Sequence, residues 1–348
     1  MEVGLFLEFP RQIGNNESEA FEYSLELVEL AEQLGIDSIW LAELPFEPAQ
    51  SVLSSPLIVG TAAASRTKRI RIGLAVAVLP LYDPIRLAQE VATMDHISGG
   101  RVEFGIGRSA SPGGYIGYNI PYNESRERFF EVLEILKLAW TQNAFSYKGR
   151  FYEYNNVSIS PRPLQLPHPP IRLATNSPNT YLAAAKLGLP IFISMRGVRK
   201  DLEKRTQMYK EEWNNFQSFT HPHISLRVPI YVAESMKTAL SDPEKSAMNF
   251  YDQLRKTVGS PLAGLSEDEN RERLERGKRF EAISYGDVLR TDLAFGTPDV
   301  VAAKLLELKE TFGLSCIIAE PNFGRLLSRQ KIAKSVQLFA KEVIPLIT

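Results

Sequence analysis

The chain has 348 residues but only one cysteine, Cys316, and four histidines. A single cysteine can form neither an intrachain disulfide nor a cysteine metal cluster, and it is typical of a protein of the reducing cytoplasm. His221 and His223 have no acidic or cysteine partner at ligand spacing, so we expect no metal site there. His168 lies in a proline-rich segment, and His96 ends a predicted helix whose last carbonyls we expect it to cap.

Excess charge and long apolar runs are also lacking. The formal charge is only −1, and no cluster of like charges is long enough to follow a nucleic-acid backbone, so we expect no nucleic-acid partner. The longest apolar run, residues 72–82, falls far short of the ~20 residues that span a bilayer. The acidic Glu2 and the early Pro10 disagree with a signal peptide. We therefore expect a cytoplasmic protein with no membrane partner.

The sequence does contain a large apolar fraction, 44% of the chain, arranged in alternating segments. Runs of strand length alternate with helical periodicity from the first residues onward. The expected strands are 3–9, 38–41, 70–79, 102–106, 171–174, 191–194, 226–232 and 316–319. The first expected helix is capped by Ser18 and closed by Gly35, and further helices are expected at 56–64, 84–97, 125–140, 180–187, 198–219, 298–312 and after Arg325.

This alternation predicts an α/β fold with a parallel sheet, because parallel strands need crossover helices. About eight such units close into a barrel, so we expect one (β/α)₈ TIM barrel over residues 1–348, with insertions in the strand-end loops. An open doubly wound sheet is the alternative. Residues 143–170, rich in proline and aromatics, are expected as an insertion over the barrel, and the charged residues 234–295 as a helical excursion that forms a mobile lid.

The glycine-rich segment that follows the fourth expected strand is the first candidate for chemistry. Gly105, Gly107 and Ala110 have the G-x-G-x-x-A spacing of a dinucleotide-binding turn, but no helix signal begins there and no acidic strand end follows about twenty residues on. We favour a loop that approaches a phosphate or a flavin, with Arg108 directed into the barrel mouth. Pairing of Arg108 with a surface carboxylate is the structural alternative.

A second candidate lies where the fifth expected strand meets its helix. The segment 174–180, with Ser177 and Thr180, brings hydroxyl and amide groups to a helix N-terminus, where backbone N–H groups and the helix dipole favour a phosphate. Ordinary capping by Ser177 or Asn179 is the alternative. Arg126 stands at another helix start, a position that favours acids, so it calls for an external anion or a neighbouring carboxylate, unless it is a solvated surface arginine.

These segments, in this order, resemble the luciferase-like, flavin-dependent monooxygenase family. The matching stretches are GLFLEF, LGIDSIWLAE, IRIGLAVAVLPLYDPIRLAQEVATMDHISGGRVEFGIGRS, ESRERFFEVLEILKLAW, GLPIFIS and FGTPDVVAAKL, which together run along essentially the whole chain. The resemblance implies the same barrel and a flavin phosphate site. The residues it implies for that phosphate are Arg108, Arg126, Thr175, Asn176, Ser177 and Thr180.

The resemblance also implies the surroundings of the flavin ring. A non-prolyl cis peptide bond in the family falls between Ala75 and Val76 here, and Ser194 and Met195 match flavin-contacting positions. Phe6, Glu43 and Leu44 are implied in the substrate pocket, although a core role suits Phe6 equally. The sequence departs from the family at LAELPF: Leu44 and Pro45 replace two histidines, the first of which serves luciferase catalysis, so light emission from a long-chain aldehyde is not expected.

Three functions follow from this resemblance. The first is a monooxygenase that uses reduced FMN, supplied by a separate flavin reductase, and O₂ to oxygenate a small organic substrate. The second is hydride transfer with a deazaflavin on the same fold, and the third is flavin binding without turnover. No catalytic residue is assigned, because the histidine position is occupied by Leu44. The family also implies a homodimer formed through the helices at 56–64 and 84–97.

Overall fold

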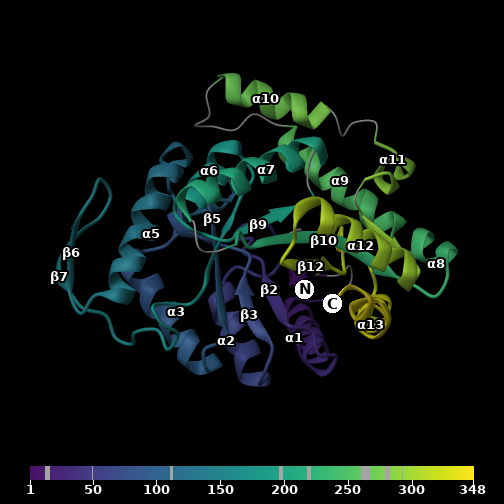
Figure 1. The fold of residues 1–348 in the computed structure, drawn as a ribbon, viewed down its shortest axis with the longest axis horizontal. Coiled ribbons are helices and arrows are strands. Elements are labelled where there is room, and N and C mark those ends of the chain that lie inside the picture. The colour runs from purple at the N-terminus through teal and green to yellow at the C-terminus, as the bar shows by residue number, and fades with distance from the viewer. Residues whose placement is uncertain are drawn as a thin grey trace.

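The computed structural model describes residues 1–11, 16–48, 50–109, 113–195, 199–217, 221–259, 267–278, 283–291 and 293–348. Within them, parallel strands form a closed barrel of eight strands that is surrounded by helices (Figure 1). The last strand of the barrel pairs in parallel with both the first and the seventh, which closes the sheet on itself. The predicted TIM barrel is therefore confirmed, and the open doubly wound alternative is wrong.

The barrel strands lie close to their predicted positions. They are β1 (Glu2–Leu7), β2 (Ser38–Leu41), β3 (Arg71–Leu74) with its continuation β4 (Ala77–Val78), β5 (Val102–Gly107), β8 (Ile171–Ala174), β9 (Ile191–Ser194), β10 (Ile224–Val232) and β12 (Cys316–Glu320). The expected third strand, 70–79, is divided into β3 and β4, and the peptide bond between Ala75 and Val76 that lies between them is cis, where the resemblance placed it. A short strand, β11 (Ala294–Gly296), pairs with the end of β10.

Helices cover the outside of the barrel and supply most of the partners of its outward-facing side chains. They are α1 (Glu17–Gln33), α2 (Pro56–Arg66), α3 (Pro84–Ser98), α4 (Gly113–Gly117), α5 (Ser125–Thr141), α6 (Pro178–Lys186), α7 (Arg199–Phe216), α8 (Met236–Ser241), α9 (Glu244–Val258), α10 (Glu267–Lys278), α11 (Tyr285–Leu289), α12 (Pro298–Phe312), α13 (Arg329–Leu338) and α14 (Ile344–Ile347). Shorter helical turns are η1 (Leu79–Leu81), η2 (Tyr122–Glu124) and η3 (Phe339–Val343). None of the described helices is long and apolar enough to cross a membrane.

Two predicted helix caps are corrected by the structure. Asn16, not Ser18, caps α1, because its side chain accepts from the backbone of Glu19 while the Glu19 carboxylate accepts from the backbone of Asn16. At the end of α3 the cap is Gly99, whose positive φ of 67° suits a residue without a Cβ. His96 does not cap the helix as we expected, since its imidazole bonds the carbonyl of Arg162 instead.

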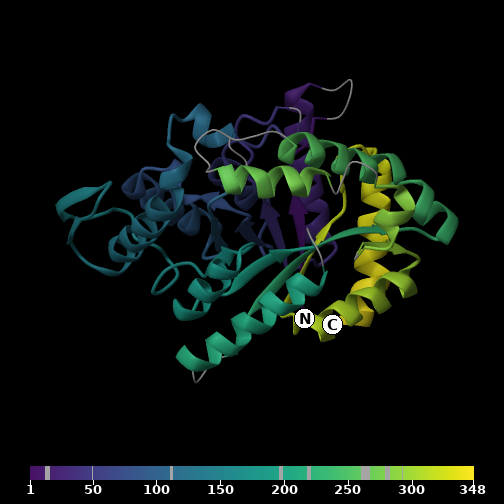
Figure 2. The same ribbon diagram turned by 90° about the horizontal axis from the view of Figure 1, so that it is seen from above.

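The proline-rich insertion lies elsewhere than predicted. Its hairpin, β6 (Phe145–Lys148) and β7 (Glu153–Val157), stands beyond α5 at the left edge of Figures 1 and 2, not over the barrel. Gln165, later in the insertion, bonds Asp95 of α3. The position follows from chain order, because the segment connects a helix to a strand and so returns along the N-terminal side of the barrel.

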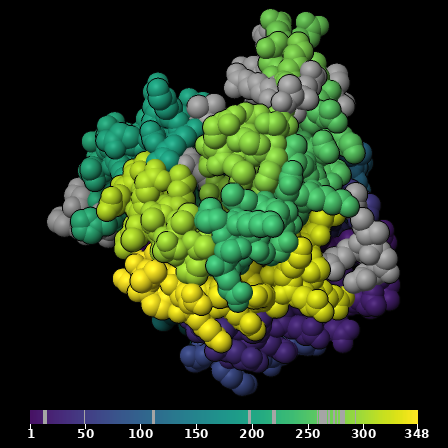
Figure 3. All heavy atoms as spheres, turned by 90° about the vertical axis from the view of Figure 1, so that its right-hand side faces the viewer, coloured from purple at the N-terminus to yellow at the C-terminus, as the bar shows by residue number. Residues whose placement is uncertain are grey.

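The charged excursion follows β10 and includes α8 to α11. Its helix α10 packs on α9 and stands out from the body of the molecule in Figures 1 and 3. The excursion also touches the barrel: Ser246 and Asn249 of α9 bond the carbonyls of Phe323 and Gly324 in the loop after β12. Movement of this segment as a lid stays a prediction. Residues 198 and 218–219, at the ends of an expected helix, lie outside the described residues.

One indole fills the middle of the barrel. Trp40 is 1% exposed and donates from Nε1 to the hydroxyl of Ser38. The strands beside it carry glycine at the same level: a Cβ on Gly4 would lie 2.9 Å from the indole Cδ1, and one on Gly73 only 2.3 Å from Cε3. Gly105 is also constrained, since its Cβ would meet the Leu74 carbonyl oxygen at 1.9 Å. Gly4 and Gly73 thus make room for the indole, while Gly105 admits the Leu74 carbonyl.

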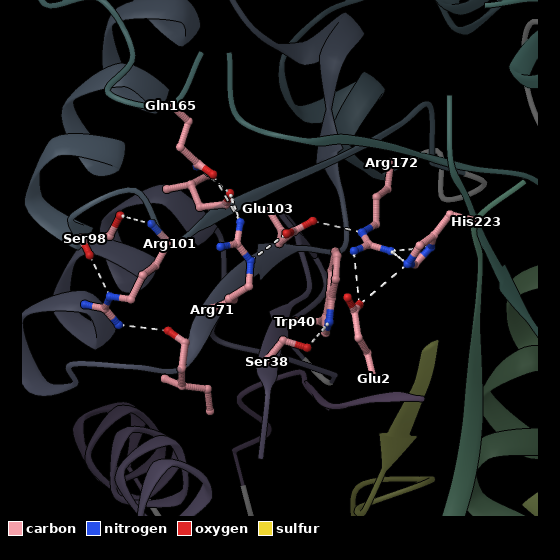
Figure 4. Close-up of polar contacts among 12 residues, drawn as sticks. Glu2, Ser38, Trp40, Arg71, Ser98, Arg101, Glu103, Gln165, Arg172 and His223 are labelled. Carbon is pink, nitrogen blue, oxygen red and sulfur yellow. Dashed lines mark hydrogen bonds and ion pairs between the residues drawn. The ribbon is translucent and has the colours of Figure 1, made fainter. Parts of the chain in front are cut away.

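Below Trp40, charged side chains close the N-terminal end of the barrel (Figure 4). Glu103 accepts from Arg71 at 2.7 Å and from Arg172 at 2.9 Å. The remaining guanidinium nitrogens of Arg172 bond His223 and Ser225, and approach Glu2. A hydrogen bond from His223 and the positive charge of Arg172 lower the pKa of the Glu2 carboxyl, against the opposing effect of burial. All three guanidinium nitrogens of Arg172 form hydrogen bonds, so we interpret this layer as structural support.

The fit between Trp40 and Gly73 leads to a stability prediction. Gly73→Ala should lower the free energy of unfolding by about 1–3 kcal/mol, because a buried methyl group would overlap the indole. Gly286→Ala is the matched control, since its Cβ would meet nothing nearer than 3.7 Å. Urea unfolding followed by circular dichroism measures both. Equal stability of the Gly73→Ala variant and the wild type would show that the indole has room to move.

Candidate functional site

Most of the predicted site residues meet at the C-terminal rim of the barrel. Arg108 follows β5, the segment 175–177 follows β8, and Ser194 ends β9. These strands are neighbours, because β5 pairs with β8 and β8 pairs with β9. Parallel strands end at the same edge of a sheet, so side chains at their carboxyl ends share one rim. Ala110, the last residue of the G-x-G-x-x-A spacing, lies outside the described residues.

A pair of hydroxyls stands at the N-terminus of α6. Ser177 occupies the N-cap position, but its side chain makes no capping bond; its Oγ lies 2.9 Å from Oγ1 of Thr180 instead. The capping alternative is therefore wrong for Ser177. Asn176 and Ser177 are exposed, while the nearby Oγ1 of Thr175 is buried beside the Tyr181 hydroxyl. Exposed donors and the positive end of the helix dipole favour an anion here.

Two arginines lie near this rim without a carboxylate partner. Arg108 donates from Nη1 to the hydroxyl of Ser125 at 3.1 Å, and its carbonyl accepts from Tyr115. Arg126 is exposed, and its guanidinium carbon lies 5.8 Å from the ring centre of Phe130. Within the described residues neither arginine forms an ion pair, so the alternative pairing with a surface carboxylate does not hold there. Because neither guanidinium has an anionic partner among the described residues, both can bind an anion from solution.

The cis bond between Ala75 and Val76 lies beside β5. A Cβ on Gly107 would stand 2.6 Å from Cγ2 of Val76 and 3.5 Å from the Cβ of Ala174, so glycine permits the close approach of Val76. We predicted that Gly107 allows close contact with a ligand. The packing of Val76 is a second reason for a glycine at this position. Short side chains thus form the floor of this half of the rim, on β3, β5 and β8.

Glu43 and Leu44 follow β2 on the same rim. The buried carboxylate of Glu43 accepts from the backbone N–H of Val78 at 2.8 Å, directly beyond the cis bond. Burial raises the pKa of Glu43 to about 7, against the opposing effect of the bonds from Val78 and the Tyr82 hydroxyl. Leu44 packs on the cluster that fills the barrel, which includes Phe6. Glu43 is therefore a buried acid with a raised pKa, next in the chain to Leu44.

Phe6 and the end of β9 complete the predicted set. Phe6 is 4% exposed and belongs to the hydrophobic cluster inside the barrel with Trp40 and Phe192, so it is a core residue, and the guanidinium of Arg227 lies over its ring. Ser194 and Met195 are half-buried, and the backbone of Met195 donates to the carbonyl of Arg227 at 3.4 Å. The predicted flavin contacts on β9 are thus held against β10.

The structure also brings together charged residues that the sequence reasoning did not identify. Glu8, Arg227, Glu320 and Arg325, which we call the rim cluster, come from just after β1, from within β10, from the end of β12 and from the loop after β12, and each is at most 8% exposed. Glu8 and Arg325 are 317 positions apart in the chain. A signal was present, because Arg227 and Glu320 are lone charges in apolar strands, where an unpaired charge is costly.

The histidines have local partners. His168 bonds the carbonyl of Pro169, and His223 belongs to the network around Arg172. Cys316 lies inside the barrel, where burial raises the pKa of its thiol to about 12. Among the described residues, no group of three His, Cys, Asp or Glu side chains is placed to hold a metal ion.

Comparison with known proteins supports the resemblance. Two uncharacterised proteins of Sinorhizobium fredii are 39% and 35% identical to this chain, over 50% and 56% of its length. The chain spans only about half the length of these relatives, 51% and 55%. It is 27% identical to the oxygenase component of the flavin-dependent trigonelline monooxygenase of Acinetobacter baylyi, over 69% of this chain and 67% of that protein. It is 24% identical to the FMNH₂-dependent dimethylsulfone monooxygenase of Pseudomonas putida, over 94% of this chain and 88% of that protein.

A solved structure and a family model extend the comparison to nearly the whole chain. The crystal structure of the monooxygenase RslO1 of Streptomyces bottropensis superposes with a TM-score of 0.80 at 26% identity, covering 99% of both chains. The model of the luciferase-like monooxygenases matches residues 1–315, from the first barrel strand to the edge of the last. The chain therefore belongs to the family of luciferase-like monooxygenases.

Proposed function

We propose that the protein is the oxygenase component of a two-component monooxygenase, which receives reduced FMN from a separate reductase and uses O₂ to oxygenate a small organic substrate. The observation that carries the proposal is the anion site at the rim: Arg108 and Arg126 without carboxylate partners, beside the uncapped hydroxyls of Ser177 and Thr180. The names of the trigonelline and dimethylsulfone relatives, which specify a flavin and FMNH₂, support the cofactor.

The described residues fit the phosphate of FMN. Ser177, Thr180 and the N-terminal N–H groups of α6 would donate to its oxygens, with Asn176 and the buried Thr175 hydroxyl alongside. Arg108 and Arg126 would balance its charge. Ala75, Val76, Ser194 and Met195 would line the ring. Bound FMN, once reduced, supplies the electrons that activate O₂.

The protein's own residues then position the reactants and exclude water. Phe6 and Leu44 give the pocket an apolar base, since both belong to the cluster inside the barrel. The carboxyl of Glu43 holds a proton near neutral pH, because burial opposes its ionisation. Glu43 thus precedes in the chain Leu44, which stands where a histidine does in luciferase.

Replacement of the phosphate arginines tests the cofactor site. Arg108→Gln and Arg126→Gln should each raise the Kd for FMN about ten- to hundred-fold, because each removes a charge-assisted hydrogen bond worth about 1.5–3 kcal/mol. Riboflavin, which has the ring without the phosphate, should bind these variants and the wild type alike. Quenching of flavin fluorescence measures both affinities.

Arg128→Gln is the matched control on the same helix, because Arg128 already pairs with Glu124. Its affinity for FMN should equal that of the wild type. Equal weakening of riboflavin and FMN in the Arg108 and Arg126 variants would place the phosphate elsewhere. A deazaflavin cofactor that bound more tightly than FMN would instead favour the hydride-transfer alternative.

Oxygenation itself is tested with reduced FMN, ¹⁸O₂ and a panel of aldehydes, sulfonates and terpenoid ketones. We expect one ¹⁸O atom from O₂ in the product of at least one class, with less hydrogen peroxide released than O₂ consumed. Mass spectrometry and peroxide assay measure the two quantities. Peroxide equal to the O₂ consumed for every compound, together with tight FMN binding, would favour a flavin-binding protein without turnover.

We further propose a homodimer, formed through α2 and α3, in a cytoplasmic protein whose residues 1–348 make one domain. Ile58 on α2 and Ile97 on α3 are 72% and 48% exposed, and contact with a second copy would bury them. Light scattering should therefore give twice the chain mass of 39.1 kDa. Ile58→Lys should reduce the mass toward that of a single chain, and a monomeric wild type would refute the dimer.

A further inference from the structure

The rim cluster is a charged site that the proposed flavin contacts do not use. Arg227 comes from β10, Glu320 ends β12, Glu8 stands one residue beyond β1, and Arg325 lies in the loop after β12. The guanidinium carbon of Arg227 is 3.5 Å from the ring centre of Phe6, so this side chain lies over the barrel interior. The cluster is therefore part of the rim and not of the outer surface.

The carboxylates of the rim cluster are engaged by the guanidinium groups. Arg227 donates from Nε to Oε2 of Glu320 at 2.8 Å and from Nη2 to Oε1 of the same residue. Arg325 donates from Nη2 to Oε1 of Glu8 at 2.8 Å, and Nη2 of Arg227 approaches that oxygen at 3.4 Å. Every carboxylate of the cluster faces an arginine, and a third acid, Glu47, also acts electrostatically on Arg325.

Donors remain after this pairing. Within the described residues, Nη1 of Arg227 and Nη1 of Arg325 donate no hydrogen bond, and the buried Nε of Arg325 faces Glu8 without hydrogen-bond geometry. The network at the opposite end differs, because every nitrogen of Arg172 has an acceptor (Figure 4). A buried ion pair contributes little to stability by itself, so unused donors at the functional end of a barrel call for a ligand.

The position of the cluster makes that ligand the substrate. Arg227 is in register with Ser194 on β9, which places it next to the proposed flavin contacts. The rim on β3, β5 and β8 is floored by short side chains and carries the phosphate site, so the flavin belongs to that half. The rim cluster occupies β1, β10 and β12, on the other half.

The loop that carries Arg325 is fixed before any ligand arrives. Gly324 has a φ of 82°, and a Cβ there would stand 1.6 Å from the carbonyl oxygen of Ser246 in α9. The hydroxyl of Ser246 donates to the Phe323 carbonyl at 2.6 Å and accepts from the N–H of Leu326 at 2.9 Å. These bonds hold both sides of Arg325, so little ordering is needed on binding.

We infer that the rim cluster binds the substrate of this protein through a carboxylate, which would accept from the free nitrogens of Arg227 and Arg325. The inference deepens the proposed function and rests on it. The groups on offer are N–H donors, whereas the carboxylate oxygens of Glu8 and Glu320 are already engaged. A carboxylate suits guanidinium donors better than a neutral carbonyl, because charge-assisted hydrogen bonds are about twice as strong.

The test uses benzoate, benzamide and benzylamine as probes, titrated calorimetrically into the FMN-saturated protein. Benzoate should bind at least about ten-fold more tightly than either of the other two. In the paired variant Arg227→Gln/Glu320→Gln, which removes both charges together, benzoate affinity should fall about ten-fold or more while FMN affinity stays unchanged. Tighter binding of benzylamine, equal binding of benzamide, or an unchanged benzoate affinity in the variant would overturn the inference.

Two further variants keep the test decisive. The paired variant Arg172→Gln/Glu103→Gln removes a buried charge pair at the opposite end of the barrel, so it should leave benzoate binding unchanged. Arg325→Lys keeps the charge but loses the fork of donors; it should weaken benzoate and remain folded if the Arg227 variant does not. If the wild type failed to bind FMN, the proposed function would fail, yet benzoate titrated into the FMN-free protein would still test the cluster.

Discussion

The Trp40 indole occupies the centre of the barrel, and the strands around it carry glycine at that level to admit it. Gly4 and Gly73 have no side chain because a Cβ would overlap the indole. The ring therefore divides the barrel interior into two polar layers with an apolar plug between them. Below it, Arg172 and its partners satisfy one another; above it, arginines retain donors and burial raises the pKa of Glu43. The Trp40 side chain thus separates the supporting network around Arg172 from the rim that carries the candidate site.

Much of this arrangement followed from local patterns in the sequence. The βα alternation predicted the barrel, because each apolar run needed a neighbouring strand and each amphipathic run a sheet to cover. Arg108 and Ser177 were identifiable because a strand end and a helix start carry a chemical meaning that does not depend on distant residues. The cis bond at Ala75 was located only through the family resemblance, since no local pattern around it predicts the isomer.

The features that the sequence did not predict correctly are of two kinds. Some depend on contacts between residues that are far apart in the chain, and others on two nearby residues that compete for the same hydrogen bond. Ser18 lost the cap of α1 to Asn16, which had the better-placed Glu19 to complete a reciprocal pair. His96 turned to a carbonyl of the insertion, whose path could not be derived from its composition. The rim cluster required the register of β1, β10 and β12, because its members meet only when the barrel closes.

The same closure has a consequence for how such a protein diversifies. Because the Trp40 indole lies between the two ends of the barrel, we expect a change of side chain on the rim to leave the network around Arg172 intact. The loop with Arg325 is held by α9, so alterations in the charged excursion can reach the rim through the hydrogen bonds of Ser246 and Asn249 and through the packing of Phe250 and Tyr251 on Phe323. The side chains of the rim, which set substrate preference, are thus freer to change in evolution than the network around Arg172.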